Sequence, residues 1–552
     1  MEEYKTTVRK EESQIQGLSN DYIKFIRFAQ WKLENIDRGI LAYITGHGFL
    51  DGPQARDMRS SLLRTFDKIY ILNLHGSARR EVAGLTERDE PVFEIQQGTA
   101  ITIAVRGGSG YGRETTVLYS DLFGSIGSKF ALLETGSIYT LEWTALQPIA
   151  PYYFFTPKHV DSLYSTYWSI TDIFGTGNRQ KDKEKRWATG FATQQDEFAI
   201  SFNDEEVHRK IRALVMSGNL SEAREHFRLC TTDQWNYEAA KAFLAKNAYD
   251  VSTCSFRPFD ERKTVFSRHV VSILRTNVMA QLDHPNLALV VSRVINDGAF
   301  SHVFVTTRRT DKIFLSSSTS TNAYIFPLYI YPGDSMSQSD IFDEGLRRSP
   351  NLSERCIQEW GMRTELDFVE TGRGDGSHTF GPEAVFYYIY AVLHSPLYRR
   401  NNEGELCTDF PRVPMPKSKE FFLSLWTLGA ELVQTHLLRR VAEGRAPFPI
   451  SGSNKVEKVA HQRSEGGNHG RVFINKEQFF AGIEQEAWEF RVGKYYPLQK
   501  WLGDRKGQRL SFEDIHHYQL IVGAIERSME IMDDIDNEIA AHRGFEADPA
   551  YA

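Results

Sequence analysis

The residues of this chain best suited to chemistry are arginines gathered in one stretch. Residues 257–312 contain nine Lys or Arg and five Asp or Glu, a net charge of +4 within a chain of net charge −7. A guanidinium is planar and presents a fork of N–H donors that fits phosphate and the acceptor atoms of guanine. A surface salt bridge is the alternative role for each of them. The charge of this stretch is compatible with a surface that faces phosphates, and its arginines include Arg257, Arg262, Arg268, Arg293, Arg308 and Arg309.

The first 150 residues alternate helical and strand-like patterns. Ser19-Asn20-Asp21 is suited to start a helix, and apolar residues then recur at helical spacing as far as Leu33. Residues 40–45 and 69–74 are short apolar runs typical of buried strands, and a helical pattern over 55–66 separates them. Residues 100–105 and 116–119 predict two further strands. A strand–helix–strand order of this kind predicts a mainly parallel sheet covered by helices.

Beyond residue 150 the pattern becomes irregular and rich in short strands. Strands are predicted over 287–294, 302–306 and 324–331, and helices over 385–393 and 421–438. Residues 457–460 and 471–475 predict a hairpin, and 512–541 a long terminal helix region. We therefore expect an α/β domain over 1–150, a mixed α/β, strand-rich domain over 151–445, and a helical extension with a hairpin over 446–552.

Composition argues against several classes of site. The four cysteines are widely spaced, without Cys-x-x-Cys, which disfavours a disulfide framework or a zinc cluster. His302, His394 and the pair His516-His517 lack the spacing of metal ligands, so no metal is expected. The N-terminus is polar, and no apolar run approaches the roughly 20 residues of a membrane span. We expect a soluble, cytoplasmic protein with no membrane contact.

Four segments of the first region carry a family resemblance: Asp21–Arg27, Gly39–Thr45, Met58–Leu63 and Ile71–Gly76. With them the region resembles the C-terminal part of adenine-specific DNA methyltransferases of the gamma type. Their catalytic domain is Rossmann-like, so the resemblance implies that residues 1–150 form the C-terminal part of such a domain. In that family the matching segments follow the catalytic Asn/Asp-Pro-Pro-Tyr loop.

The next segment, Val92–Ile101, looks like the family motif in which an aromatic residue precedes a strand. The resemblance implies that Phe93 stacks on the adenine that is flipped out of the duplex. An exocyclic amine inside the base stack cannot reach a methyl donor, and a flat ring replaces lost stacking worth about 1–3 kcal/mol. An ordinary core phenylalanine is the alternative interpretation of Phe93.

The chain departs from the methyltransferase pattern in its catalytic loop. Neither Asn-Pro-Pro-Tyr nor Asp-Pro-Pro-Tyr occurs, and Ala150-Pro151-Tyr152-Tyr153 is the nearest string. The glycine-containing strand end that binds S-adenosylmethionine in this family has no counterpart either. The resemblance therefore implies that S-adenosylmethionine is the methyl donor but is bound mainly by a part absent from this chain.

A second set of ordered segments extends over about residues 150–545. They are Ser255–Asp260, Leu289–Arg293, Ser301–Thr306, Tyr324–Tyr329, Tyr388–Arg399, Asp409–Pro414, Trp488–Phe490 and Lys500–Leu502. With them the chain resembles the C-terminal specificity region of type ISP restriction–modification enzymes. In these enzymes that region grips the duplex and reads base edges, which would make 151–445 a target-recognition domain and the six arginines named above candidates for contacts with DNA phosphates or base edges. Arg400–Gly404 departs from the family, which usually continues there with a more helical segment that contains a tyrosine.

Together these patterns predict the specificity-bearing part of an adenine-specific DNA methyltransferase in a restriction–modification or phage-defence system. The expected partners are double-stranded DNA and a separate polypeptide, either the N-terminal methyltransferase half or a helicase or nuclease subunit. Helicase and nuclease motifs are not found in this sequence. A nonenzymatic DNA-recognition subunit and a truncated remnant are the alternatives.

Overall fold

The computed structural model describes the chain apart from residues 12–14, 77–88, 96, 108–113, 158–161, 176–185, 230–234, 296–298, 317–320, 333–347, 442–444, 464–469 and 546–552. Internal contacts divide the chain into two compact units. The first consists mainly of Met1–Ser165, and the second of most of the chain from Thr166 onward.

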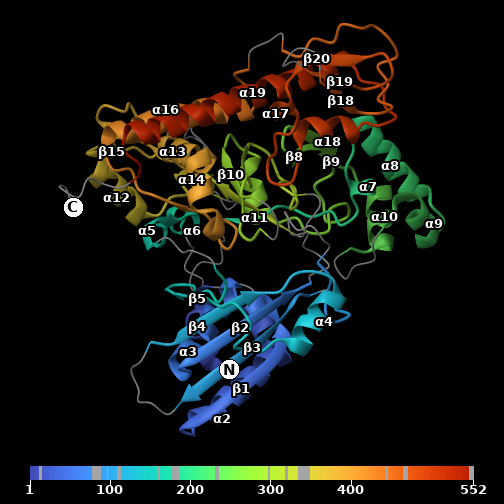
Figure 1. Ribbon diagram of the computed structural model, residues 1–552. Helices are drawn as coiled ribbons and strands as arrows, with labels where there is room; N and C mark the ends of the chain where they lie inside the picture. The colour runs from blue at the N-terminus through green and yellow to red at the C-terminus, as the bar shows by residue number, and fades with distance from the viewer. Residues whose placement is uncertain are drawn as a thin grey trace. The chain divides into compact units, whose positions relative to one another are not determined.

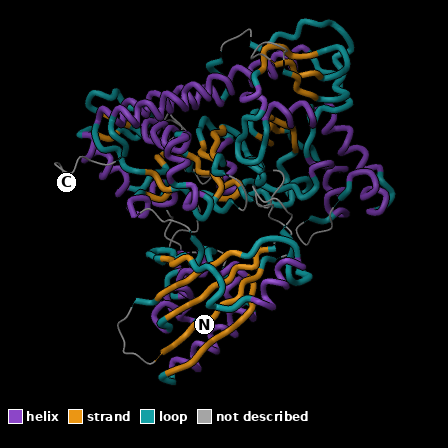
Figure 2. Tube along the Cα trace, viewed as in Figure 1, coloured by secondary structure: helices purple, strands orange, loops and turns teal. Residues whose placement is uncertain are grey.

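The first unit is built on a five-stranded mixed sheet (Figures 1 and 2). Strand β3 lies between β1 and β2 and is antiparallel to both. Strand β2 pairs with β4 in parallel, and β4 pairs with β5 antiparallel. The order is β1-β3-β2-β4-β5, with bounds β1 Arg38–Gly46, β2 Lys68–His75, β3 Thr99–Gly107, β4 Thr116–Asp121 and β5 Thr144–Leu146.

The predicted mainly parallel sheet is therefore wrong, since one of the four strand pairings in the described part of the sheet is parallel. Strands β1 and β2 do run in the same direction and are connected through a helix, as the sequence order indicated. Strand β3 inserts between them, so that Ile101 pairs with Ile44 on one side and with Leu72 on the other. Apolar periodicity identifies a strand but does not specify which strands become its neighbours.

Helices α2 (Asp21–Glu34) and α3 (Arg56–Thr65) cover one face of this sheet. The predicted helix start is confirmed, because the Asn20 side chain accepts a hydrogen bond from the Tyr22 N–H at 3.0 Å. Ile26 of α2 and Leu62 of α3 pack with Ile69 of β2 in the first hydrophobic core. The unit also contains α1 (Val8–Glu11), α4 (Ile126–Thr135) and α5 (Ser162–Thr166), of which the last ends at the boundary.

The second unit combines small sheets with helices. Its largest sheet is four-stranded, in the antiparallel order β11-β10-β12-β7. Its strands are β6 Trp168–Ser169, β7 Ala188–Thr189, β8 Ser252–Arg257, β9 Asp260–Thr264, β10 Ala288–Ser292, β11 Val303–Thr306, β12 Ala323–Pro327, β13 Tyr329–Ile330, β14 Ser349–Pro350, β15 Asp367–Phe368, β16 Thr379–Phe380, β17 Arg412–Val413, β18 Ala460–Gln462, β19 Gly470–Phe473 and β20 Phe479–Ile483.

The helices of this unit include a long terminal one that runs along α16 (Figure 1). Its start is fixed by reciprocal hydrogen bonds between Ser511 and Asp514, which form a capping box. The helices are α6 Ile170–Ile173, α7 Asp196–Ala199, α8 Asp204–Met216, α9 Leu220–Phe227, α10 Tyr237–Lys246, α11 Thr276–Met279, α12 Glu354–Thr364, α13 Pro382–His394, α14 Pro396–Asn401, α15 Glu403–Leu406, α16 Lys419–His436, α17 Gln485–Trp488, α18 Pro497–Gly503 and α19 Phe512–Ala541.

Several predicted elements of the second unit are confirmed. They include the three strands over 287–331, the two helices that became α13 and α16, and the terminal helix α19. The predicted hairpin is confirmed in its pairing, because Ala460 lies opposite Phe473, although the tip at 464–469 is outside the described residues. No helix in the described part of the chain is long and apolar enough to cross a membrane.

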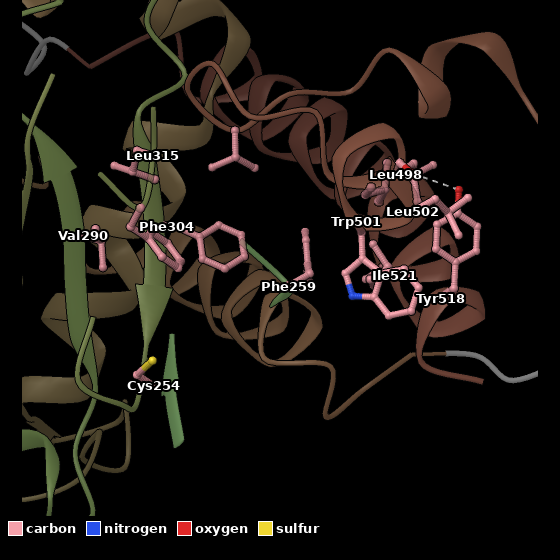
Figure 3. Close-up of a cluster of buried hydrophobic side chains, with 14 of the residues drawn as sticks. Cys254, Phe259, Val290, Phe304, Leu315, Leu498, Trp501, Leu502, Tyr518 and Ile521 are labelled. Carbon is pink, nitrogen blue, oxygen red and sulfur yellow. Dashed lines mark hydrogen bonds between the residues drawn. The ribbon is translucent and has the colours of Figure 1, made fainter. Parts of the chain in front are cut away.

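A large hydrophobic core joins the central strands of the second unit to its C-terminal helices (Figure 3). Phe259 and Phe304 meet edge to face with their ring centroids 5.0 Å apart. Trp501 of α18 packs against Tyr518 of α19, whose hydroxyl donates a hydrogen bond to the Leu498 carbonyl at 3.2 Å. Residues far apart in the sequence therefore hold the segment 252–312, which carries the candidate arginines, in a fixed position.

Candidate nucleic-acid interface

In the first unit, Phe93 lies on a segment that crosses the carboxyl ends of β2 and β1. The Gly76 N–H donates to Asp89 Oδ2 at 2.6 Å, and the His47 N–H donates to the Gly98 carbonyl at 3.0 Å. These two contacts fix the segment on both sides of Phe93. The Phe93 side chain is 43% exposed. The structure therefore places the predicted stacking residue at the surface, where a planar ligand can reach its ring.

Glycine at position 98 permits this crossing. A Cβ atom there would lie 2.5 Å from Cε1 of His47 and 2.8 Å from the backbone oxygen of His75. Such distances are far shorter than van der Waals contact, so any other residue would displace the segment from the strand ends. The packing at Gly98 therefore holds the segment of Phe93 close to the two histidines.

A connected set of polar side chains lies beneath this segment, and we call it the histidine network. His47 Nδ1 lies 3.0 Å from the amide oxygen of Asn73, whose amide N–H donates to the Tyr119 hydroxyl at 2.9 Å. The Tyr119 hydroxyl and His75 Nε2 both contact Oδ1 of Asp121, each at 2.5 Å. His47, which follows β1, is thus connected through Asn73, Tyr119 and Asp121 to His75, the last residue of β2.

The electrostatics of the network favour an ionised Asp121. Burial alone would raise the pKa of its carboxyl, but the hydrogen bonds from His75 and Tyr119 outweigh burial and hold that pKa below its ordinary value. Burial, together with Asp121, raises the pKa of the Tyr119 hydroxyl, which remains a neutral donor. The His75 ring also stacks on Phe123, with centroids 3.9 Å apart and planes 15° apart. The network therefore holds its two imidazoles in fixed orientations.

Sequence reasoning missed the histidine network, although a signal for it was present. His47 follows the first predicted strand and His75 follows the second, so both lie where strands of one direction end. Polar side chains at strand ends are typical of binding sites in α/β sheets. Asn73 lies near the end of β2 and Asp121 is the last residue of β4, and neither belongs to a recognisable motif.

The structure places two of the six candidate arginines in the interior of the second unit. Arg257 forms an ion pair with Asp311, with Nη1 and Oδ1 2.9 Å apart. Arg262 forms one with Asp260, with Nη2 and Oδ2 2.6 Å apart. Both arginines are about 5% exposed. Their guanidinium groups therefore hold parts of this unit together, and we do not retain them as candidates for DNA contact.

Two further candidates, Arg268 and Arg308, are exposed, and Arg309 is half-buried and forms an ion pair with Asp283. Arg308 has its Nε 2.7 Å from Glu261, and Arg268 lies on the segment that follows β9. The Arg309 guanidinium lies over the ring of Phe266, 4.0 Å from its centroid. Phe266 is two residues before Arg268 in that segment. These contacts bring Arg268, Arg308 and Arg309 to one part of the surface, which we call the arginine surface. Arg293 is half-buried elsewhere, over the ring of Phe410 at 5.4 Å.

A surface cavity of about 400 Å³ is lined by residues of the neighbouring segments 192–197 and 311–313. Its lining includes Gln194, Lys312 and the buried Asp311. Burial raises the pKa of the Asp311 carboxyl to about 6, despite the nearby Arg257. The cavity adjoins the arginine surface because residues 308–312 are continuous in sequence. No sequence pattern indicated this cavity or Gln194.

Among the residues that the structure describes, no group of three or more His, Cys, Asp or Glu side chains is arranged to hold a metal ion.

Comparison with known proteins identifies the family. Residues 185–534 match the family described as the Type ISP C-terminal specificity domain. A search of curated proteins found no match. The fold resembles the structure of the ATP-dependent Type ISP restriction-modification enzyme LlaBIII bound to DNA. Their TM-score is 0.66 at 18% sequence identity, over 95% of this chain and 34% of that chain.

Two further solved structures have the same fold. One is a nuclease-deletion mutant of the Type ISP enzyme LlaGI in complex with a DNA substrate mimic, with TM-score 0.63, 17% identity, and coverage of 97% of this chain and 49% of that chain. The other is the DrdV–DNA complex, with TM-score 0.64, 20% identity, and coverage of 94% of this chain and 52% of that chain. This chain thus spans between a third and about half of these proteins. The match over residues 185–534 shows that the chain belongs to the family of Type ISP C-terminal specificity domains.

Proposed function

We propose that this chain selects the DNA target of a type ISP restriction–modification enzyme. The observation that carries the proposal is the arginine surface within the part of the chain that belongs to the specificity-domain family. Exposed guanidinium groups bind phosphates and release condensed counterions, which is the main source of affinity for duplex DNA. The solved neighbours in complex with DNA support this function by analogy of fold.

We also propose that the first unit supplies one wall of an adenine pocket in a DNA methyltransferase. Support comes from the exposed ring of Phe93 and from the histidine network beneath its segment. A stacking ring beside hydrogen-bonding imidazoles suits a planar base that has left the duplex. In this proposal Phe93 replaces part of the stacking that the adenine loses.

A cavity in the described part of this unit does not fit S-adenosylmethionine. It has a volume of about 170 Å³ and lies between β2, β3 and α4. Its lining is apolar apart from Ser137 and the Tyr70 hydroxyl, whereas the donor carries ammonium, carboxylate and sulfonium charges. In this proposal a partner polypeptide therefore binds the donor.

The edge of the sheet is the surface we propose for that partner. In the described part of the sheet, β1 is an edge strand, with Ile40 67% and Ile44 49% exposed. Helix α2, which packs against β1, exposes Tyr22, Phe25, Phe28 and Trp31 to about half of their surface. An edge strand with apolar side chains can pair with another strand, and large apolar patches mark protein interfaces. A methyltransferase polypeptide that continues this sheet would cover both features.

One observation favours a second candidate function, a DNA-recognition subunit without enzymatic activity. The sequence contains neither Asn-Pro-Pro-Tyr nor Asp-Pro-Pro-Tyr, the loop that orients the target amine in adenine methyltransferases. In this alternative the chain directs another effector to its site. Tritiated methyl transfer to DNA by a mixture of this chain with the methyltransferase polypeptide separates the two candidates, because the subunit would bind DNA but leave it unmethylated.

The DNA-binding proposal is tested by fluorescence anisotropy with a labelled duplex at several salt concentrations. We expect a steep loss of affinity with salt for the unmodified chain. Arg308→Gln should weaken binding to every duplex and reduce the slope of log K against log salt by about 1. Arg363→Gln is the matched control, since Arg363 is a similarly exposed arginine paired with Glu359 on α12. Salt-independent binding, or no binding to any duplex, would reject the proposal.

A further inference from the structure

Gln194 is held in an unusual backbone conformation between two buried residues. Its φ is +60°, in the left-handed region that glycine prefers, and its side chain is exposed. Thr193 before it is buried and accepts a hydrogen bond at its backbone oxygen from Ser272 Oγ at 2.7 Å. Gln195 after it is buried and donates from its amide to the Val270 carbonyl at 3.2 Å. The fold therefore presents Gln194 at the surface rigidly, and at a conformational cost.

Backbone hydrogen bonds connect the segment before Gln194 to the segments that carry the arginine surface. Ala192 and Ile273 exchange two backbone hydrogen bonds, each 2.9 Å long. The Phe191 N–H donates to the Thr310 carbonyl at 3.0 Å, one residue beyond Arg309. A duplex whose phosphates contact the arginine surface would therefore lie close to the cavity that Gln194 lines.

The charges around that cavity favour a base edge over a phosphate. Lys312 and Arg228 line it together with Asp196 and Glu197, so it carries both signs. Carboxylates repel a phosphate but accept hydrogen bonds from the amine of a base. A glutamine amide offers one acceptor and a pair of donor hydrogens, which match N6–H and N7 of adenine in the major groove. The amide geometry and the mixed charge thus suit the same ligand, the exposed edge of an adenine.

We propose that Gln194 reads the major-groove edge of an adenine in one A·T pair of the target duplex. This inference rests on the proposed DNA-recognition function and adds a specificity-determining residue to it. Gln194 supplies the bidentate contact at the base, while Arg268, Arg308 and Arg309 hold the adjoining phosphates. The Gln194 side chain is exposed and so accessible to a base, and the hydrogen bonds of Thr193 and Gln195 hold the chain on both sides of it.

Selection from a randomised duplex library tests the inference with the whole 552-residue chain. The unmodified chain should enrich one sequence with an A·T pair at a fixed position. Gln194→Ala should lose the preference at that position and keep it elsewhere. Its affinity for the selected duplex should fall about 5- to 150-fold, the range for one bidentate base contact. Gln358→Ala, which removes an exposed glutamine of α12, should select the same sequence as the unmodified chain.

A second variant separates base recognition from folding. Gln194→Gly removes the amide but adopts a positive φ without strain, so its melting temperature should equal or exceed that of the unmodified chain while the preference is still lost. An unchanged selected sequence in Gln194→Ala overturns the role of Gln194 alone. Loss of binding to all duplexes with a lower melting temperature in both variants also overturns it, because the residue would then be structural. If the unmodified chain selects no sequence, the DNA-recognition proposal itself fails.

Discussion

Asp260 and Arg505 form an ion pair in the interior of the second unit, with Oδ1 and Nη2 3.1 Å apart although 245 residues separate them in the sequence. Arg262 contacts the other carboxylate oxygen at 2.6 Å. Burial would raise the pKa of the Asp260 carboxyl, but the two guanidinium groups outweigh burial and hold that pKa below its usual range. One carboxylate thus links the β8–β9 hairpin to the segment after α18.

Asp260→Asn should lower the free energy of unfolding by about 3–5 kcal/mol, because it removes the nearest anion from two buried guanidinium groups, whose other carboxylates are 3.6 and 3.7 Å away. Denaturant titration followed by circular dichroism measures the loss. Glu261→Gln is the matched control, since its pair with Arg308 is about half exposed and worth less than about 1 kcal/mol. Equal effects of the two substitutions would show that the interior pair does not stabilise the fold.

Acid should destabilise the protein through His436. Burial, together with Arg399, lowers the pKa of His436 to about 3, below the ordinary value of 6.5. Between these values the unfolded chain binds a proton that the folded chain does not. The stability that neutral His436 provides is therefore complete above pH 6.5 and is lost as pH falls toward 3. The contribution of His436 to the slope of unfolding free energy against pH approaches about 1.4 kcal/mol per pH unit.

His436→Gln should reduce the slope of unfolding free energy against pH between 6.5 and 4.5. The reduction should approach about 1.4 kcal/mol per pH unit, which corresponds to one bound proton. Chemical denaturation at several pH values measures both slopes. The comparison isolates His436 because other titrating groups, among them the neighbouring His394, remain in both proteins. Identical slopes would mean that the pKa of His436 is the same in the folded and unfolded states, which would contradict the prediction.

Phe93→Ala should leave the free energy of unfolding within about 0.5 kcal/mol of the unmodified protein, because the ring is 43% exposed. Methyl transfer to DNA in a mixture with the methyltransferase polypeptide should fall about 5- to 150-fold, which corresponds to the stacking of one base. Tritium incorporation measures the rate. Phe512→Ala removes a ring that is 79% exposed at the start of α19 and should leave transfer unchanged. Full activity of Phe93→Ala would exclude the stacking role.

The double substitution Phe25→Ser and Phe28→Ser should reduce self-association of the isolated chain, because both rings belong to the exposed aromatic row of α2. Static light scattering over a concentration series measures this change, and the melting temperature should stay nearly constant. The same variant should bind the methyltransferase polypeptide more weakly. Phe512→Ser serves as the control. A variant that binds the partner normally would place the interface elsewhere.

The sequence determined the elements whose signals are local. The helix cap at Asn20 acts within one turn, so α2 begins where that residue predicts, and α19 begins at the predicted residue 512, where the structure shows a capping box at Ser511. Apolar runs likewise located β10 to β12. Many ordered segments indicated the family before any fold was known, and the match over residues 185–534 bears this out.

Tertiary structure alone decided what depends on partners distant in the sequence. Strand β3 entered between β1 and β2, which no periodicity specifies. Arg262 became an interior residue because Asp260 and Arg505 meet there, whereas Arg308 found only an exposed carboxylate. The left-handed conformation of Gln194 arises from hydrogen bonds that its neighbours make to residues nearly 80 positions away. A side chain's role depends on its burial and its partners, and these exist only once the chain has folded.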